Sequence, residues 1–181
     1  MILKSVRWEK PSIKWMKLNI DGSSIVNLGM ARERGVIRDE EGNWVVGFAR
    51  RIGSASSFLA KLWALRDGLL LCLKSHIKAM IIEMDAKAIV DAFSHQNNSN
   101  SIISSLMDDC KQLVTQIPQP RFRHVYREAN RCVDFLAKLG SSMDVDFVVL
   151  PSLPVDTLSI FEADCRGLYM NRLCTEPVIA V

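Results

Sequence analysis

Three aspartates that are widely separated along the chain stand near the ends of predicted elements. Asp21 follows an alternating strand, Asp85 follows the apolar run Met80–Met84, and Asp134 lies one turn into the last predicted helix. Carboxylates of like charge repel when they are gathered away from water, unless a cation lies between them. Two Mg²⁺ ions about 4 Å apart would relieve this repulsion and could activate a water for attack on phosphorus. The three residues are therefore candidate catalytic residues and candidate metal ligands.

Each aspartate also has an ordinary structural interpretation. Asp21 precedes a glycine and fits a turn, Asp85 precedes a predicted helix and fits its N-cap, and Asp134 fits an exposed helix acid. Spacing alone does not separate these interpretations from a shared site. The order of the elements favours a shared site, because neighbouring strands would bring Asp21 and Asp85 to one end of a sheet.

A lysine lies on a helix face where apolar side chains are expected. The helix predicted over 57–74 turns by 100° per residue, so Phe58 and Leu65 fall within about 60° of Lys61. The stem of Lys61 could cover apolar surface while its ammonium reaches water. Alternatively, the ammonium points at the aspartates, and the lysine then changes the chemistry of the site.

The elements that must position these side chains are read from hydrophobic periodicity. Alternation with a period of two predicts three strands joined by short turns, at 14–20, 35–39 and 44–49. Apolar spacings of three and four residues then predict helices that alternate with two more strands. In chain order, these later elements are a helix at 57–74, a strand at 80–84, helices at 86–93 and 102–117, a strand at 121–127 and a helix at 129–137. The pattern predicts an α/β fold with a mixed sheet and helices packed on it.

Composition and charge are those of an ordinary compact domain. The chain has 181 residues, about half of them apolar, and a formal net charge of +3, which is too small to diagnose nucleic-acid binding. Apolar runs fall short of the roughly 20 residues that cross a bilayer, and the N-terminal segment lacks a signal-peptide core. Five scattered cysteines without a CxxC pair are typical of reduced thiols. We expect an intracellular protein, nuclear or cytoplasmic, that contacts no membrane.

The predicted elements place the domain at residues 14–141. Residues 1–13 are then an N-terminal extension, and residues 142–181 are a C-terminal extension. Periodicity fades after about Gly140 and a proline follows at Pro151. We therefore expect the C-terminal extension to lie over the domain or to be partly disordered.

Taken together, the motifs resemble the type-1 ribonuclease H-like domains of plants that are found in LINE-type (non-LTR) retroelements and in related host proteins. The resemblance spans about residues 12–140. The stretches that carry it are 17–23, 35–39, 62–69, 82–86 and 125–140. It implies a ribonuclease H-like fold: a five-stranded sheet in which strands 4 and 5 run parallel to strand 1, with helices on both faces.

The resemblance also implies an activity, the Mg²⁺-dependent endonucleolytic hydrolysis of RNA in an RNA–DNA hybrid. Four acids hold two metal ions in active members of the family. Carried onto this chain, the first, third and fourth acids are Asp21, Asp85 and Asp134. The second belongs in the stretch 60–65, where this chain has Lys61. We therefore expect the activity to be impaired.

Other positions depart from the family pattern and could contact nucleic acid. The family's Gly-Asn-Pro-Gly turn appears at 26–29, which keeps Asn27 as a candidate contact. The small residues that the family has on the second strand appear here as Arg32, Glu33 and Arg34. At alternate strand positions these arginines could hold phosphates, or they could form an ordinary solvated sheet edge.

The charge change at Lys61 leads to a specific hypothesis. A cation beside a Mg²⁺ position repels the metal, so we expect the ammonium to occupy part of the metal volume and to pair with Asp21 and Asp85. Glu83 offers an alternative, because it shares a strand face with Asp85 and could replace the missing acid.

Three functions remain compatible with the sequence: a hybrid-specific ribonuclease, active or formerly active; a catalytically inactive nucleic-acid-binding module; and a protein-interaction domain. The expected partner is an RNA–DNA hybrid or another nucleic acid. We expect no small-molecule cofactor and a monomeric protein.

Overall fold

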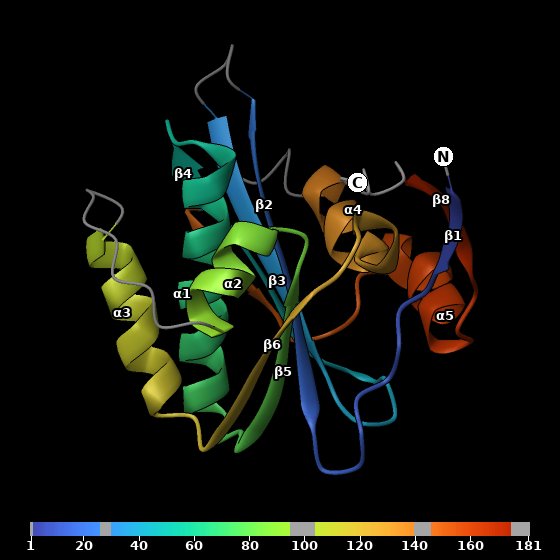
Figure 1. Ribbon diagram of the computed structural model, residues 1–181, viewed down its shortest axis with the longest axis horizontal. Helices are drawn as coiled ribbons and strands as arrows, with labels where there is room; N and C mark the ends of the chain where they lie inside the picture. The colour runs from blue at the N-terminus through green and yellow to red at the C-terminus, as the bar shows by residue number, and fades with distance from the viewer. Residues whose placement is uncertain (1, 26–29, 95–103, 140–145, 175–181) are drawn as a thin grey trace, which may run out of the picture.

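A central sheet between two layers organises the part of the chain that the computed structural model describes, residues 2–25, 30–94, 104–139 and 146–174. Figure 1 shows α1, α2 and α3 on one side of this sheet, and α4, α5 and the pair β1–β8 on the other. In chain order the elements, with η for a 3₁₀ turn, are β1 (Ile2–Val6), β2 (Met16–Ile25), β3 (Met30–Arg38), β4 (Trp44–Gly53), α1 (Ser57–Lys74), β5 (Ala79–Met84), α2 (Lys87–Ser94), α3 (Ser104–Thr115), β6 (Gln119–His124), η2 (Arg127–Ala129), α4 (Arg131–Leu139), β7 (Phe147–Leu150), η4 (Val155–Thr157), α5 (Leu158–Cys165) and β8 (Met170–Cys174).

The main sheet has the strand order β6-β5-β2-β3-β4-β7. Strands β2, β3 and β4 form an antiparallel meander, β5 runs parallel to β2, and β6 runs parallel to β5. The predicted five-stranded mixed sheet is therefore confirmed. β7 adds a sixth strand, antiparallel to β4. It comes from residues 142–181, so part of that segment belongs to the sheet.

The two ends of the described chain pair with each other. β1 and β8 form a separate antiparallel ladder in which Leu3 lies opposite Leu173. Strands β1, β7 and β8 were not predicted from the sequence. Each has only four or five residues, which is too short for alternation to distinguish a strand from a loop.

Helix α1 rests directly on β2 because a glycine lies beneath it. Ser56 caps the helix by accepting a hydrogen bond from the Leu59 amide at 3.2 Å. A Cβ atom at Gly22 would lie less than 3.0 Å from the backbone of Ala60 and Lys61. This close approach positions Lys61 over the sheet. The core between α1 and the sheet includes Leu18, Ile20, Phe48, Leu62, Leu65, Leu69 and Ile82.

The opposite face of the sheet buries charge. Arg38 is 1% exposed, and its guanidinium lies between the rings of Trp8 and Phe161, at 4.3 and 4.9 Å. Its Nη2 donates to Asp164 Oδ2 at 3.0 Å. Lys17 is equally buried, and burial lowers its pKa. The segment before β2 and helix α5 thus cover Arg38 and supply its contacts.

All five cysteines lie among the described residues, and all are free. Burial raises the pKa of Cys72 and of Cys110 to about 12, which makes these two thiols unreactive. None of the helices in the described ranges has the length and apolar character needed to cross a membrane.

Candidate active site

The sheet brings Asp21 and Asp85 to the same place from neighbouring strands. β2 continues to Ile25, beyond its predicted end, so Asp21 lies within the strand. Asp85 directly follows β5, the parallel neighbour of β2. Because the register pairs Asn19 with Glu83, the two aspartates occupy the next corresponding positions on the same face.

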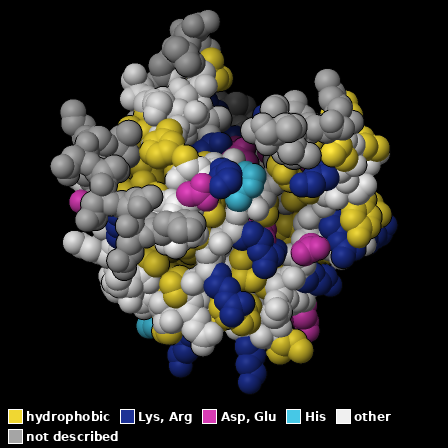
Figure 2. All heavy atoms as spheres, in the orientation of Figure 1, with side chains coloured by type: hydrophobic (Ala, Val, Ile, Leu, Met, Phe, Trp, Pro, Cys, Tyr) yellow, Lys and Arg dark blue, Asp and Glu magenta, His cyan; other side chains and the backbone are white. Residues whose placement is uncertain are grey.

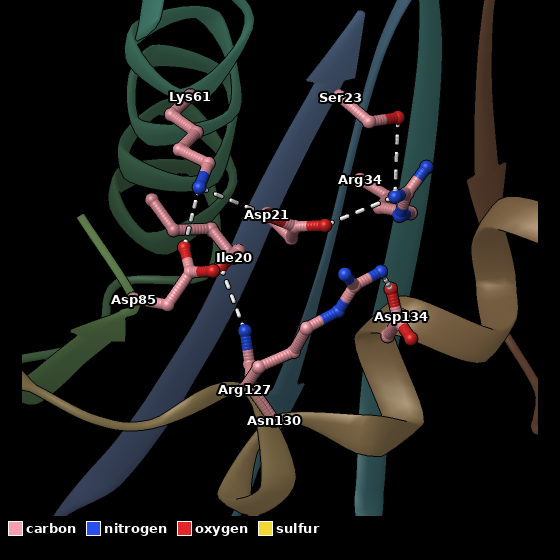
Figure 3. Close-up of polar contacts among 9 residues, drawn as sticks. All are labelled: Ile20, Asp21, Ser23, Arg34, Lys61, Asp85, Arg127, Asn130 and Asp134. Atoms are coloured by element: carbon pink, nitrogen blue, oxygen red, sulfur yellow. Dashed lines mark hydrogen bonds and ion pairs between the residues drawn. The ribbon is translucent and has the colours of Figure 1, made fainter. Parts of the chain in front are cut away.

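Asp134 reaches the site from the other layer, as Figure 3 shows. It lies in the first turn of α4, where it was predicted. The Asn130 side chain fixes the start of this helix against β2 by donating from Nδ2 to the Ile20 carbonyl at 3.0 Å. Asn130 is buried, so this hydrogen bond sets the position of Asp134 relative to Asp21.

Lys61 points at the aspartates, as Figure 3 shows. Its Nζ lies 2.6 Å from Asp85 Oδ1 and 3.6 Å from Asp21 Oδ1. The expected pairing is present, and the Lys61 side chain is only 17% exposed. The alternative in which the ammonium reaches bulk water does not describe this lysine. One ammonium thus bridges two carboxylates.

The prediction that Arg34 faces nucleic acid does not fit its position. Its side chain is 3% exposed, and Nη2 lies 2.9 Å from Asp21 Oδ2 and 3.3 Å from Ser23 Oγ. The antiparallel register places Arg34 directly opposite Asp21, so the carboxylate draws the guanidinium inward. Arg34 is therefore part of the aspartate cluster.

The other two candidate nucleic-acid contacts are Arg32 and Asn27. Arg32 is half-buried and lies opposite Ser23 and Arg51 in the sheet. Asn27 lies outside the described residues. Arg32 takes no part in the ion pairs that define the site among the described residues.

Arg127 is a cation of this site that was not predicted from the sequence. Its Nη2 lies 2.6 Å from Asp134 Oδ1. The hydrogen bond and charge of Asp134, with smaller contributions from Asp21 and Asp85, raise the pKa of Arg127. The 3₁₀ turn η2 brings its guanidinium back to Asp134, seven residues further on, and no pattern in the sequence indicated this turn.

The site therefore holds three carboxylates and three cations. The carboxylates are those of Asp21, Asp85 and Asp134, and the cations are Lys61, Arg34 and Arg127. Mg²⁺ needs carboxylate oxygens that are free to coordinate, whereas one oxygen of each aspartate accepts a hydrogen bond from a cation. Within the described ranges, His, Cys, Asp and Glu form no group of three or more that could hold a metal ion. As the side chains lie, they do not fit a two-Mg²⁺ site.

Glu83 does not replace the missing acid. Its Oε1 lies 2.8 Å from Lys17 Nζ, and its Oε2 accepts a hydrogen bond from Asn19 at 3.0 Å. The carboxylate is 3% exposed. The Glu83 carboxylate thus forms a buried ion pair with Lys17, one row away from Asp85 on the same face of the sheet.

Comparisons with known proteins identify the family and the fold. A family described as reverse transcriptase-like matches residues 19–140. At1g65750 of Arabidopsis thaliana, named as a ribonuclease H protein, is 32% identical over 164 residues, which cover 91% of this chain and 26% of that protein. The chain thus spans about a quarter of the length of this curated relative.

Two solved structures share the fold at lower identity. The N-terminal RNase H domain of rv2228c from Mycobacterium tuberculosis has a TM-score of 0.64 and 22% identity, over 67% of this chain and 89% of that chain. LC11-RNase H1 in complex with an RNA/DNA hybrid has a TM-score of 0.61 and 23% identity, over 67% of this chain and 92% of that chain. At these identities the likeness concerns the fold.

Proposed function

Because the chain belongs to the reverse transcriptase-like family and has a ribonuclease H-like fold, we propose that it is a nucleic-acid-binding domain that holds RNA–DNA hybrids without Mg²⁺-dependent cleavage. The observation that carries this proposal is the Lys61 ammonium between Asp85 and Asp21, at 2.6 and 3.6 Å. The domain would keep the fold and the surface of a ribonuclease H while lacking its metal centre.

Electrostatics supports the loss of metal binding. Two unit charges 4 Å apart interact by about 4 kcal/mol at an effective dielectric constant of about 20. A divalent ion beside Lys61 would meet roughly twice that repulsion, and Arg34 adds a second cation on Asp21. Three carboxylates are already neutralised by three cations, so the site gains little from a metal ion.

The preference for a hybrid rests on similarity to proteins of this fold. LC11-RNase H1 was solved with an RNA/DNA hybrid, and At1g65750 carries the name of a ribonuclease H protein. Loss of the metal centre leaves phosphate recognition possible, because phosphate contacts depend on basic side chains and backbone amides rather than on the catalytic acids.

Binding and cleavage can be measured on one set of labelled probes. Fluorescence anisotropy with an RNA–DNA hybrid, double-stranded DNA and double-stranded RNA is compared in EDTA and in Mg²⁺, and denaturing gels report cleavage. We expect salt-dependent hybrid binding that does not require Mg²⁺, with intact RNA in both buffers.

Two results would contradict the proposal. One is cleavage in Mg²⁺ that disappears in Asp21→Asn, a control that separates this site from a contaminating nuclease. The other is failure to bind the hybrid at low salt, which would favour a protein-interaction domain. Lys61→Glu tests the cause: we expect only weak recovery of cleavage, because Arg34 still binds Asp21.

A further inference from the structure

The edge strand β6 presents two arginines on its outward face. The side chains alternate, with Arg121 and Arg123 exposed and Phe122 half-buried. Phe122 stacks on Phe93 of α2, with ring centroids 4.7 Å apart. Successive strand residues point to opposite faces, so the two arginines project away from α2.

These arginines share a sheet face with the aspartate cluster. The parallel register places Arg121 beside Ile81, and Arg123 beside Glu83. Asp85 follows Glu83 by two positions and therefore lies on the same face, one row further on. Rows on one face are about 6.6 Å apart. The arginines thus form a short line that leads toward the candidate active site.

Glu83, the acid beside Arg123, does not cancel the positive charge of the two arginines. Glu83 makes its closer ion pair with Lys17, at 2.8 Å, whereas Arg123 lies 3.6 Å away and is 51% exposed. Arg121 lies against an aromatic ring, 4.1 Å from the centroid of Trp15. Figure 2 shows lysine and arginine side chains gathered over the strip that Figure 1 draws as β6.

We propose that Arg121 and Arg123 bind the phosphates of a single nucleic-acid strand that extends from the candidate active site along β6. Arginine is weakly hydrated and pairs with phosphate in a bidentate geometry. A line one side chain wide can follow one backbone, whereas a duplex presents two. An aromatic ring beside an arginine is also a common feature of surfaces that bind single strands.

This inference rests on the proposed function, because the strand is the continuation of a hybrid held at the site. The competing explanation is that charged residues on β6 prevent edge-to-edge pairing with another chain, as they do on many edge strands. The first explanation predicts that replacing the arginines weakens nucleic-acid binding, and the second predicts that it promotes self-association. Substitution of the arginines therefore separates them.

The test uses a blunt RNA–DNA hybrid and the same hybrid with a single-stranded extension at either end. Anisotropy titrations compare the natural protein with Arg121→Gln/Arg123→Gln. The control is Lys74→Gln/Lys111→Gln, which removes the same charge from α1 and α3 on the opposite layer. We expect the natural protein to bind one extended probe about tenfold more tightly than the blunt hybrid at low salt.

The arginine variant should lose that advantage while binding the blunt hybrid as before. Its salt dependence on the extended probe should fall by about 1.4 in the slope of log K against log salt, for two lost phosphate contacts. Equal affinity of the natural protein for blunt and extended probes would overturn this inference, as would an equal loss in the lysine control. Self-association of the arginine variant with unchanged affinity would also overturn it. Failure to bind the blunt hybrid would instead contradict the proposed function.

Discussion

The Lys61 ammonium lies 2.6 Å from Asp85 Oδ1, although a helix supplies one residue and a strand end supplies the other. Their contact depends on how closely α1 approaches β2. The approach is possible because Gly22 has no side chain beneath Ala60 and Lys61. Helix packing therefore determines where the ammonium lies, and packing changes should affect the site.

Gly22→Ala should destabilise the protein by roughly 1–3 kcal/mol, the usual range for overpacking. The new Cβ would lie less than 3.0 Å from helix backbone, which cannot rotate away as a side chain can. Urea denaturation measures the effect, with Ser24→Ala on the same strand as the control. Equal stability of the two variants would show that α1 does not rest on Gly22 as described.

Removing each guanidinium of the site should have unequal effects on folding. Arg34→Gln should cost about 2–3 kcal/mol, because Asp21 then keeps only the longer contact to Lys61 in a buried position. Arg127→Gln should cost less than about 1 kcal/mol, because its side chain is 68% exposed. Urea denaturation of both variants tests this order, and a larger cost for Arg127→Gln would contradict it.

The stability of the protein should depend on pH through Glu33. Burial, together with the charge of Asp67, raises the pKa of Glu33 well above its ordinary value of 4.5. Among the described residues, neither oxygen of the Glu33 carboxylate accepts a hydrogen bond, and Arg50 Nε lies 3.8 Å from Glu33 Oε1. The protonated form therefore favours folding. This contribution is present below pH 4.5 and is lost as the pH rises through the pKa of the folded protein.

Glu33→Gln keeps the side chain neutral at every pH. It should stabilise the protein at pH 7 by about 1–3 kcal/mol, the usual cost of a buried unpaired group, and should leave stability near pH 4 unchanged. Urea midpoints across this range provide the measurement. The control Glu41→Gln, at an exposed turn, should show no such gain, and an equal gain in both variants would count against the assignment.

Asp164→Asn should be strongly destabilising, by about 3–5 kcal/mol, because it leaves the Arg38 guanidinium buried without a counter-charge. Glu162→Gln on the same helix removes an acid that is 51% exposed, so it should change stability by less than about 1 kcal/mol. Thermal unfolding of the two variants checks this difference. Similar melting temperatures would mean that α5 does not stabilise the sheet through Arg38.

Much of the fold could be predicted because periodicity and order are local properties of the chain. The strands of the meander, the helix that carries Lys61 and the two later strands all follow from the spacing of apolar residues. The short strands β1, β7 and β8 could not be predicted, because their pairing depends on partners far along the chain. The burial of Arg38 could not be predicted either, because its partner Asp164 comes from the C-terminal segment and reaches it only in the folded protein.

The candidate site was predictable in its carboxylates and in Lys61, but not in its other cations. Arg34 was assigned to the surface from strand alternation alone. Strand alternation assigns side chains to the two faces of the sheet, but it does not show which face another element covers. Here α4 covers the face of the sheet that carries Arg34. Arg127 requires the 3₁₀ turn before α4 to bring it back to Asp134, and no periodic pattern indicates such a turn.

Divalent-ion binding tests the central claim most directly, that Lys61 and Arg34 have replaced the metal centre. The natural protein is titrated with Mn²⁺, a paramagnetic substitute for Mg²⁺, and bound ion is followed by electron paramagnetic resonance. The double variant Lys61→Glu/Arg34→Ser, checked for folding by circular dichroism, serves as the comparison. We expect no saturable binding by the natural protein and clear binding by the double variant. Saturable binding by the natural protein that disappears in Asp21→Asn would contradict the claim.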